Sequence, residues 1–211
     1  MKNERQETTG LSVEQEPEDQ AILERFRTGD GEAVGDLADR YASRLYNFGL
    51  RMCGNSEDAQ DMVQDTFLNV IKYLKGFRRE TKLKNWLFRL AASVCLKKRR
   101  GKNDLDRELS LDTLRPSYKQ GLLPDIPDWS QNPVEDLLND ELRAYLAAAI
   151  SELPPNYRIV FNLRELEGFS TAEAGEMLDL TPQAVKTRLH RARAFLRKEL
   201  DGYYQEHRGQ A

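Results

Sequence analysis

Side chains that could carry out catalysis are few and scattered in this sequence. The chain has two histidines, His190 and His207, and two cysteines, Cys53 and Cys95, which stand in apolar surroundings typical of buried free thiols. The sequence contains no Cys-x-x-Cys pair, no glycine-rich phosphate loop and no histidine beside a plausible nucleophile. We therefore predict no catalytic residue, no metal site and no cofactor.

The chemistry that the sequence does offer is ionic. The 211 residues carry a net charge of -3, but the charges are segregated along the chain. Residues 67–102 hold twelve lysines and arginines against one acid, and residues 186–198 hold six against none. Residues 1–20 and 103–141 are acidic instead. Two basic segments set apart by acidic ones predict two separate contacts with a polyanion.

The elements that carry these charges are predicted to be helices. Apolar residues recur at spacings of three and four through residues 20–98 and again after residue 140, and no segment alternates as a strand does. We predict an all-α fold of two small helical domains, residues 19–102 and 140–205, joined by a flexible linker. The linker, residues 103–139, is acidic and holds four prolines. A polar, aperiodic N-terminal tail is predicted over residues 1–18.

Within the first domain, helix boundaries are predicted from caps and breakers. One helical run continues to Met52 and is broken at Gly54-Asn55. A second helix is predicted to begin with Ser56 as its N-cap, and a third near Lys82. No stretch reaches the roughly 18 apolar residues of a membrane helix, and the first 19 residues lack the apolar centre of a secretory signal. We therefore expect a cytoplasmic protein without membrane insertion.

The second domain carries a helix-turn-helix pattern over about residues 172–191. Ser170 and Glu173 have the spacing of a capping box, and Thr181-Pro182 predicts the start of the next helix. The outer face of that helix offers polar and basic side chains that can bind base edges and phosphates in the major groove: Thr181, Gln183, Lys186, Thr187, Arg188, His190 and Arg191. A helical hairpin with a solvated basic face is the alternative.

Longer stretches of the chain resemble bacterial sigma factors. The segments LPPNYRIVF (153–161), RELEGFS (164–170) and VKTRLHRAR (185–193) resemble domain four of that family. The segment DAQDMVQDTF (58–67) and residues 77–91 resemble domain two. Because domains one and three are replaced by a short linker, the chain is similar to the extracytoplasmic-function (ECF) group. The resemblance implies that domain four recognises the minus-thirty-five promoter element.

The resemblance also gives a role to an acidic helix face. It implies that the helix starting near Ser56 docks on a coiled coil of core RNA polymerase through Asp61, Met62, Val63, Gln64, Asp65 and Phe67. From the residues alone, a solvated acidic face is the favoured explanation of Asp61 and Asp65.

A third implied site reads the minus-ten element as a single strand. It comprises Phe77, Arg78, Lys82, Trp86, Arg89, Ser93 and Lys97, and its loop 77–82 would receive a flipped-out base. Phe77 could equally be a core residue, and periodicity alone favours the core for Trp86. Many relatives carry Arg-Asn where this chain has Ala92-Ser93, so contacts from those two positions do not transfer directly.

The resemblance therefore implies a transcription initiation factor without catalytic activity, with core RNA polymerase, promoter DNA and an anti-sigma factor as partners. Two other classes are considered. A stand-alone helix-turn-helix regulator explains the second domain but leaves the acidic face and the aromatic-basic patch unused. A nucleic-acid-processing enzyme is disfavoured by the missing nucleophile and metal ligands.

Overall fold

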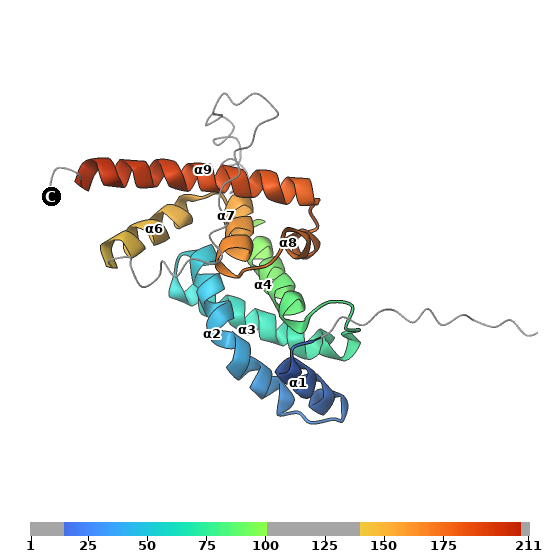
Figure 1. Cartoon of the computed structure of the whole chain (residues 1–211). Helices are drawn as coiled ribbons and strands as arrows, with labels where there is room; N and C mark the ends of the chain where they lie inside the picture. Colours follow the sequence, from blue (N-terminus) through green and yellow to red (C-terminus); the bar gives the residue numbers. More distant parts are fainter. Residues whose placement is uncertain (1–14, 101–139, 208–211) are drawn as a thin grey trace, which may run out of the picture.

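A computed structural model describes residues 15–100 and 140–207. Within these ranges the chain is helical and contains no strand, which confirms the all-α prediction. The elements are α1 (Pro17–Arg27), α2 (Ala33–Cys53), α3 (Ser56–Tyr73), a 3-10 turn (Leu74–Gly76), α4 (Leu83–Arg100), α6 (Asp140–Glu152), α7 (Pro155–Phe161), a π-helical turn (Asn162–Leu166), α8 (Thr171–Leu178) and α9 (Pro182–His207) (Figure 1). The predicted linker, 103–139, lies outside the described residues.

The folded N-terminal module, residues 15–100, begins before residue 18, where the predicted tail was expected to end. Helix α1 begins at Pro17, and Gln15 is buried. The Gln15 amide donates to the Thr81 carbonyl at 2.9 Å and its oxygen accepts from the Leu83 backbone N–H at 2.6 Å. The prediction of a tail up to residue 18 is therefore wrong at its end, because a single polar side chain anchors the segment. Residues 1–14 lie outside the described part of the chain.

The single helical run predicted up to Met52 is two helices. Helix α1 ends before Thr28 and α2 starts at Ala33, and between them Gly29 adopts φ +93°, a left-handed conformation that suits glycine. The N-cap of α3 is Asn55 rather than Ser56, since the Asn55 side chain accepts from the Asp58 backbone N–H at 2.8 Å. Both differences lie at helix ends, and the spacing of apolar residues does not indicate at which residue a helix begins or ends.

Helices α2, α3 and α4 form the core of this module. Helices α2 and α3 pack closely where Gly49 faces Ala59 and the Met62 side chain. Leu83, Leu87 and Ala91 of α4 are fully buried and stand four residues apart, on the face that closes the bundle. No described helix is long and apolar enough to cross a bilayer.

The C-terminal module, residues 140–207, is built on the long helix α9, and α6 and α7 pack against the same side of it (Figure 1). The predicted capping box is present, with the Glu173 N–H donating to Ser170 and the Ser170 N–H to Glu173. Asp179 ends α8 in the left-handed conformation. The tight turn is closed by the Leu180 N–H, which donates to the Gly175 carbonyl at 2.9 Å. The helix-turn-helix prediction is confirmed.

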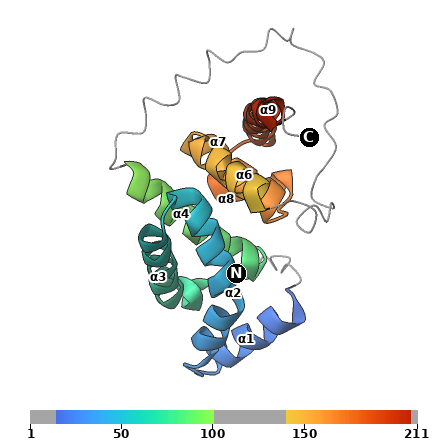
Figure 2. The same cartoon turned by 90° about the vertical axis from the view of Figure 1, so that its left-hand side faces the viewer.

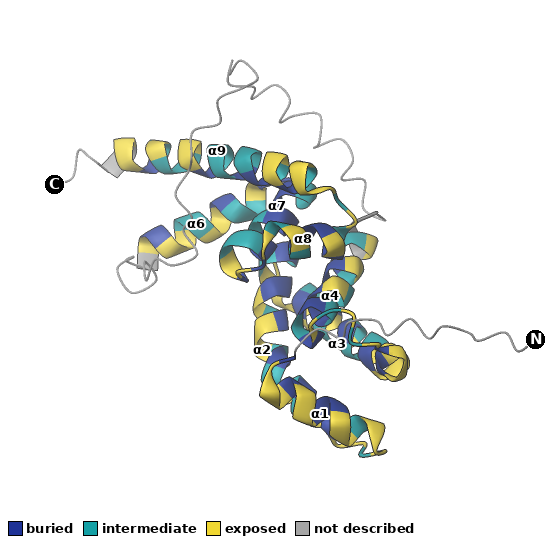
Figure 3. Ribbon diagram, turned by 45° about the vertical axis from the view of Figure 1, so that its right-hand side comes forward, coloured by how far each residue is buried: buried dark blue, intermediate teal, exposed yellow. Residues whose placement is uncertain are grey.

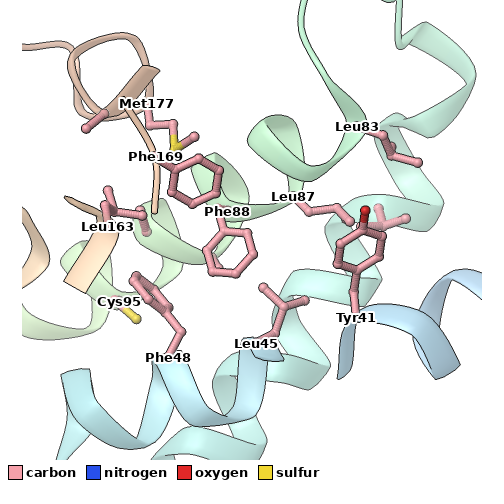
Figure 4. Packing of buried hydrophobic residues seen from close by; sticks show 14 of the residues in the cluster. Tyr41, Leu45, Phe48, Leu83, Leu87, Phe88, Cys95, Leu163, Phe169 and Met177 are labelled. Atoms are coloured by element: carbon pink, nitrogen blue, oxygen red, sulfur yellow. The ribbon is translucent and has the colours of Figure 1, made fainter. Parts of the chain in front are cut away.

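The two modules pack against each other. Helix α8 lies on α4, and α6 and α7 contact α2 (Figure 2). Buried residues continue from α4 into α8 (Figure 3), and one apolar cluster contains residues of both modules, including Phe48 and Phe88 on one side and Leu163, Phe169 and Met177 on the other (Figure 4).

Candidate nucleic-acid and protein interfaces

The start of α9 presents the first candidate surface. Thr181 caps the helix by accepting from the Ala184 N–H at 3.2 Å, and its position remains exposed. Gln183, Lys186 and Thr187 are exposed too, with the Thr187 hydroxyl donating to the Gln183 carbonyl at 2.9 Å. The N-terminal half of α9 therefore offers amide and ammonium groups to a ligand without any rearrangement.

The remaining residues predicted on this face are less accessible. Arg188, His190 and Arg191 are half-buried. The Arg191 guanidinium donates to the Tyr157 hydroxyl at 3.0 Å, which ties α9 to α7. Arg191 thus has a structural contact in addition to the predicted DNA contact, whereas Arg188 has no such bond within the described chain.

Helix α4 carries the second candidate surface. Arg89, Ser93 and Lys97 are all exposed and lie four residues apart, so they form one stripe along the helix. The stripe has a cationic side chain at each end and a hydroxyl group between them, and such groups bind the phosphates of a nucleic-acid backbone. The sequence prediction of these three positions agrees with their exposure.

The loop preceding α4 is shaped by an aromatic pair. Phe77 is buried and its ring centroid lies 5.2 Å from that of Trp86, which is half-buried. Phe77 therefore packs against Trp86 and offers little surface of its own, so only Trp86 of this predicted pair is accessible to DNA. Arg78 and Lys82 are exposed, as expected for ligand contacts.

An ion pair from α1 fixes the same loop. Arg79 adopts φ +59°, a conformation unusual for a side chain with a Cβ, and its guanidinium pairs with the carboxylate of Glu24. The hydrogen bond from Arg79 holds the pKa of Glu24 below its ordinary value. This anchor joins residues 55 positions apart, so no local pattern in the sequence predicts it.

Helix α3 carries the candidate protein-binding face. Asp61 and Gln64 are exposed and Asp65, Val63 and Phe67 are half-buried. Met62 is fully buried beneath Gly49, so its predicted role as a contact residue is wrong and it belongs to the core.

Two apolar residues of α3 lie at the surface and were not predicted as contact residues. Leu68 and Ile71 are 57% and 56% exposed, although Ile71 has the helical spacing of a core residue. An open groove lies between α2 and α3, lined in part by Tyr46, Val63 and Gln64, and Gln64 stands one helical turn before Leu68. Exposed apolar side chains next to carboxylates are typical of a protein-binding surface. In the described residues no group of three histidine, cysteine or acidic side chains is placed to hold a metal ion.

Comparisons with known proteins agree with this layout. Residues 37–104 match the family Sigma-70 region 2, and residues 143–196 match Sigma-70, region 4. The chain is 30% identical over 185 residues to the ECF RNA polymerase sigma factor SigW of Bacillus subtilis (strain 168), covering 84% of this chain and 94% of that one. It is also 30% identical over 190 residues to the ECF RNA polymerase sigma factor SigE of Mycolicibacterium smegmatis, covering 88% of this chain and 68% of the relative.

Solved structures give the same result. The chain superposes on CnrH in its complex with the cytosolic domain of CnrY with a TM-score of 0.60 at 26% identity, covering 88% of this chain and 98% of that one. The fold also resembles that of the sigma factor RpoE bound to the anti-sigma factor NepR from Bartonella quintana, with a TM-score of 0.56 at 19% identity over 81% of this chain and 98% of that one. The chain belongs to the ECF group of RNA polymerase sigma factors.

Proposed function

We propose that this sigma factor docks on core RNA polymerase through α3, holds the minus-ten element on α4 and its preceding loop, and reads the minus-thirty-five element with α9. The observation that carries the proposal is the presence of two exposed, cationic helix surfaces on two modules, each matching a Sigma-70 region. Binding energy alone drives strand opening in this scheme, so the protein needs no catalytic residue or cofactor. It acts in the cytoplasm, with the polymerase and the chromosome.

At the upstream element, the N-terminal half of α9 enters the major groove. Gln183 and Lys186 stand first on the exposed face, where a recognition helix contacts base edges. Glutamine can bind adenine and lysine guanine, while Arg188 and the capping residue Thr181 are placed for phosphates.

At the minus-ten element, the aromatic pair and the cationic stripe act together. Trp86 is partly exposed and its ring packs against that of Phe77, so an unstacked base can contact a ring whose position is fixed. Such stacking stabilises a bound base by about 1–3 kcal/mol, enough to offset much of its unstacking. Arg89 and Lys97 then hold the strand backbone by charge.

In the contact with the polymerase, the exposed part of α3 supplies charged groups for specificity and apolar surface for burial. Asp61 and Asp65 meet basic residues of the enzyme, and Leu68 and Ile71 add an apolar contact beside them. An anti-sigma factor is a further proposed partner, since the solved structures that resemble this chain include complexes with such regulators.

Docking on the polymerase is tested with a charge reversal. The double variant Asp61→Arg/Asp65→Arg is expected to abolish binding to purified core enzyme while its circular dichroism stays that of the wild type. Asp39→Arg/Asp201→Arg reverses two exposed acids elsewhere and makes the same change in net charge, so it serves as the matched control. Normal core binding by the first variant, or equal loss in the control, contradicts the docking face.

Promoter recognition is tested by transcription in vitro with core enzyme on genomic fragments. We expect Arg188→Ala to weaken footprints over the upstream element, and to reduce the slope of log affinity against log salt by about one. Lys198→Ala removes an exposed cation further along α9 and should leave the footprint unchanged. Absence of start-site selection by the wild-type protein on every template would refute the proposed function.

A further inference from the structure

Helix α1 contacts the loop 77–82 and lies before the residues that match Sigma-70 region 2 (Figure 1). That match begins at residue 37, whereas α1 spans Pro17–Arg27. The loop precedes α4 and carries Arg78 and Lys82, two exposed cations of the candidate minus-ten surface. The contacts between α1 and this loop are therefore made by residues that the family match does not cover.

Along the loop, more and less accessible side chains alternate. Arg78, Glu80 and Lys82 are exposed, whereas Phe77 is buried and Arg79 and Thr81 are half-buried. Each of the less accessible residues has a partner outside the loop, namely the Trp86 ring, the Glu24 carboxylate and the Gln15 amide. The direction in which the exposed cations point therefore depends on how their neighbours in the loop are held.

The first anchor is a pair of hydrogen bonds to Gln15, which is 7% exposed. Its amide nitrogen donates to the Thr81 carbonyl at 2.9 Å, and its amide oxygen accepts from the Leu83 backbone N–H at 2.6 Å. A primary amide can donate and accept at the same time, as a peptide group does. Gln15 thereby fixes the end of the loop and the start of α4, one helical turn before Trp86.

The second anchor holds an unusual backbone conformation. Arg79 has φ +59°, in the left-handed region, and a residue with a Cβ stays there only when its surroundings hold it. Its guanidinium pairs with Glu24 of α1, and its side chain is only 17% exposed. Because α1 neutralises Arg79, the loop offers the charges of Arg78 and Lys82 to a nucleic acid.

Helix α1 is itself fixed on α2. Ile22 and Leu23 of α1 are buried, and the Tyr41 hydroxyl of α2 donates to the Asp19 carboxylate at 2.8 Å. The Arg40 guanidinium lies 3.0 Å from the same carboxylate. The loop is therefore tied through α1 to the core of the N-terminal module, in addition to its contact with α4 through Phe77.

We propose that Gln15 and Glu24 are positioning residues for base recognition in the minus-ten element, and that they hold the loop 77–82 in the shape that receives the flipped-out base without touching DNA themselves. A site discriminates between ligands only when its groups are held to within about 0.5 Å. Without an anchor the cations of the loop still attract the strand, but the choice between bases is lost. This inference rests on the proposed function, in which the loop and Trp86 hold the minus-ten element as a single strand.

The Glu24 anchor is tested with holoenzyme and single-stranded oligonucleotides that carry the minus-ten sequence of a promoter selected by the wild type, with each base placed in turn at every position. At the position of the flipped-out base, we expect Glu24→Ala to lower the affinity ratio between the preferred and the next-best base about fivefold or more, which is the low end of what one stacked base contributes. Affinity for an unrelated single strand should not fall, because the exposed cations remain. Glu24→Gln keeps an oxygen that accepts from Arg79 and should keep most of the preference. Glu32→Ala removes an exposed carboxylate just before α2 and is the matched control.

The Gln15 anchor is tested with Gln15→Leu, which keeps most of the side-chain volume and removes both hydrogen bonds. We expect the preference to fall at the same position as in Glu24→Ala. Gln20→Leu makes the same change at an exposed site on α1 and should behave like the wild type. Footprints over the upstream element should stay those of the wild type in every variant, which shows that each one folds and binds core enzyme. If Gln15→Leu does not fold, Glu24→Ala decides alone, because Glu24 is exposed.

Wild-type base preference in Glu24→Ala would overturn the positioning role of Glu24, and the same result for folded Gln15→Leu would overturn that of Gln15. An equal loss of affinity for all bases, or the same loss of preference in the control variants, would also overturn the inference. If the wild-type holoenzyme itself shows no base preference on single strands, the proposed function fails at the minus-ten element and this inference fails with it. Preference in the wild type that persists in the variants leaves the proposed function intact.

Discussion

A methyl group added at Gly175 tests the geometry of the helix-turn-helix most directly. A Cβ at this position would lie 2.8 Å from the Leu180 carbonyl oxygen, closer than real Cβ atoms approach, and that oxygen is part of the backbone. The Leu180 N–H donates to the Gly175 carbonyl at 2.9 Å, so the turn cannot move without weakening its own closing bond. We expect Gly175→Ala to displace the start of α9.

Gly202 provides the matched control because it is a helical glycine with open space where its Cβ would be. Replacing a glycine within a helix by alanine stabilises it by about 1 kcal/mol, a gain that both substitutions share. Crowding of a packed site costs about 1–3 kcal/mol, and only Gly175 bears it. The unfolding free energies of the two variants should therefore differ by about 1–3 kcal/mol, with Gly202→Ala the more stable.

Urea unfolding followed by circular dichroism measures this difference, and footprinting over the upstream element measures its effect on DNA. We expect Gly175→Ala to weaken the upstream footprint and Gly202→Ala to leave it unchanged. Equal stabilisation by the two alanines, with intact footprints for both, would refute the argument that the turn is closed around a glycine.

Three further predictions concern the stability contributed by two buried polar side chains and by the N-cap of α8. Burial raises the pKa of Asp19 above its ordinary 3.8, so the stability that this group contributes is fully present below pH 3.8 and is lost as the pH rises through the raised value. Acidification from about pH 7 to about pH 4 should therefore raise the unfolding free energy of the wild type relative to that of Asp19→Asn, as measured by urea unfolding. A difference in unfolding free energy that stays constant over this pH range would contradict the argument. Arg158→Met leaves the Met52 and Leu153 carbonyls, among others, without their donor and should lower the unfolding free energy by about 3 kcal/mol, whereas the exposed Arg197→Met should change it little. Ser170→Ala removes the cap of α8 and should lower the same quantity by about 1 kcal/mol; an unchanged urea midpoint would show that the capping box adds no stability.

The helix-turn-helix was predictable because its signals are local. Ser170 and Glu173 are three residues apart, and Thr181 precedes the proline that starts α9, so each cap is contained in a few neighbouring positions. Exposure of Gln183 and Lys186 then follows from the helical period alone. Such signals do not depend on what the rest of the chain packs against.

The errors arise where tertiary contacts decide. Met62 was assigned to the contact surface because it lies inside a segment that resembles the family as a whole, although its helical spacing from Ala59 and Thr66 is that of a core residue. The close approach of Gly49 on α2 shows that its side chain faces inward. Ile71 lies about 100° around α3 from the buried Val70, at the edge of the apolar stripe, so it is exposed although Leu74 beyond it is buried. A period indicates the apolar stripe of a helix but not how much of its width the neighbouring helices cover.

The position of Ala92 shows how helix α4 can serve three purposes. At 100° per residue, Leu83 and Ala91 point into the N-terminal core, Phe88 and Ala92 point toward the C-terminal module, and the stripe from Arg89 to Lys97 points outward. The contact between the two modules therefore covers a different face of α4 from the candidate DNA stripe, and Arg89, Ser93 and Lys97 stay exposed while the modules are packed together. A substitution on one of these faces can therefore be chosen without changing the side chains of the other two.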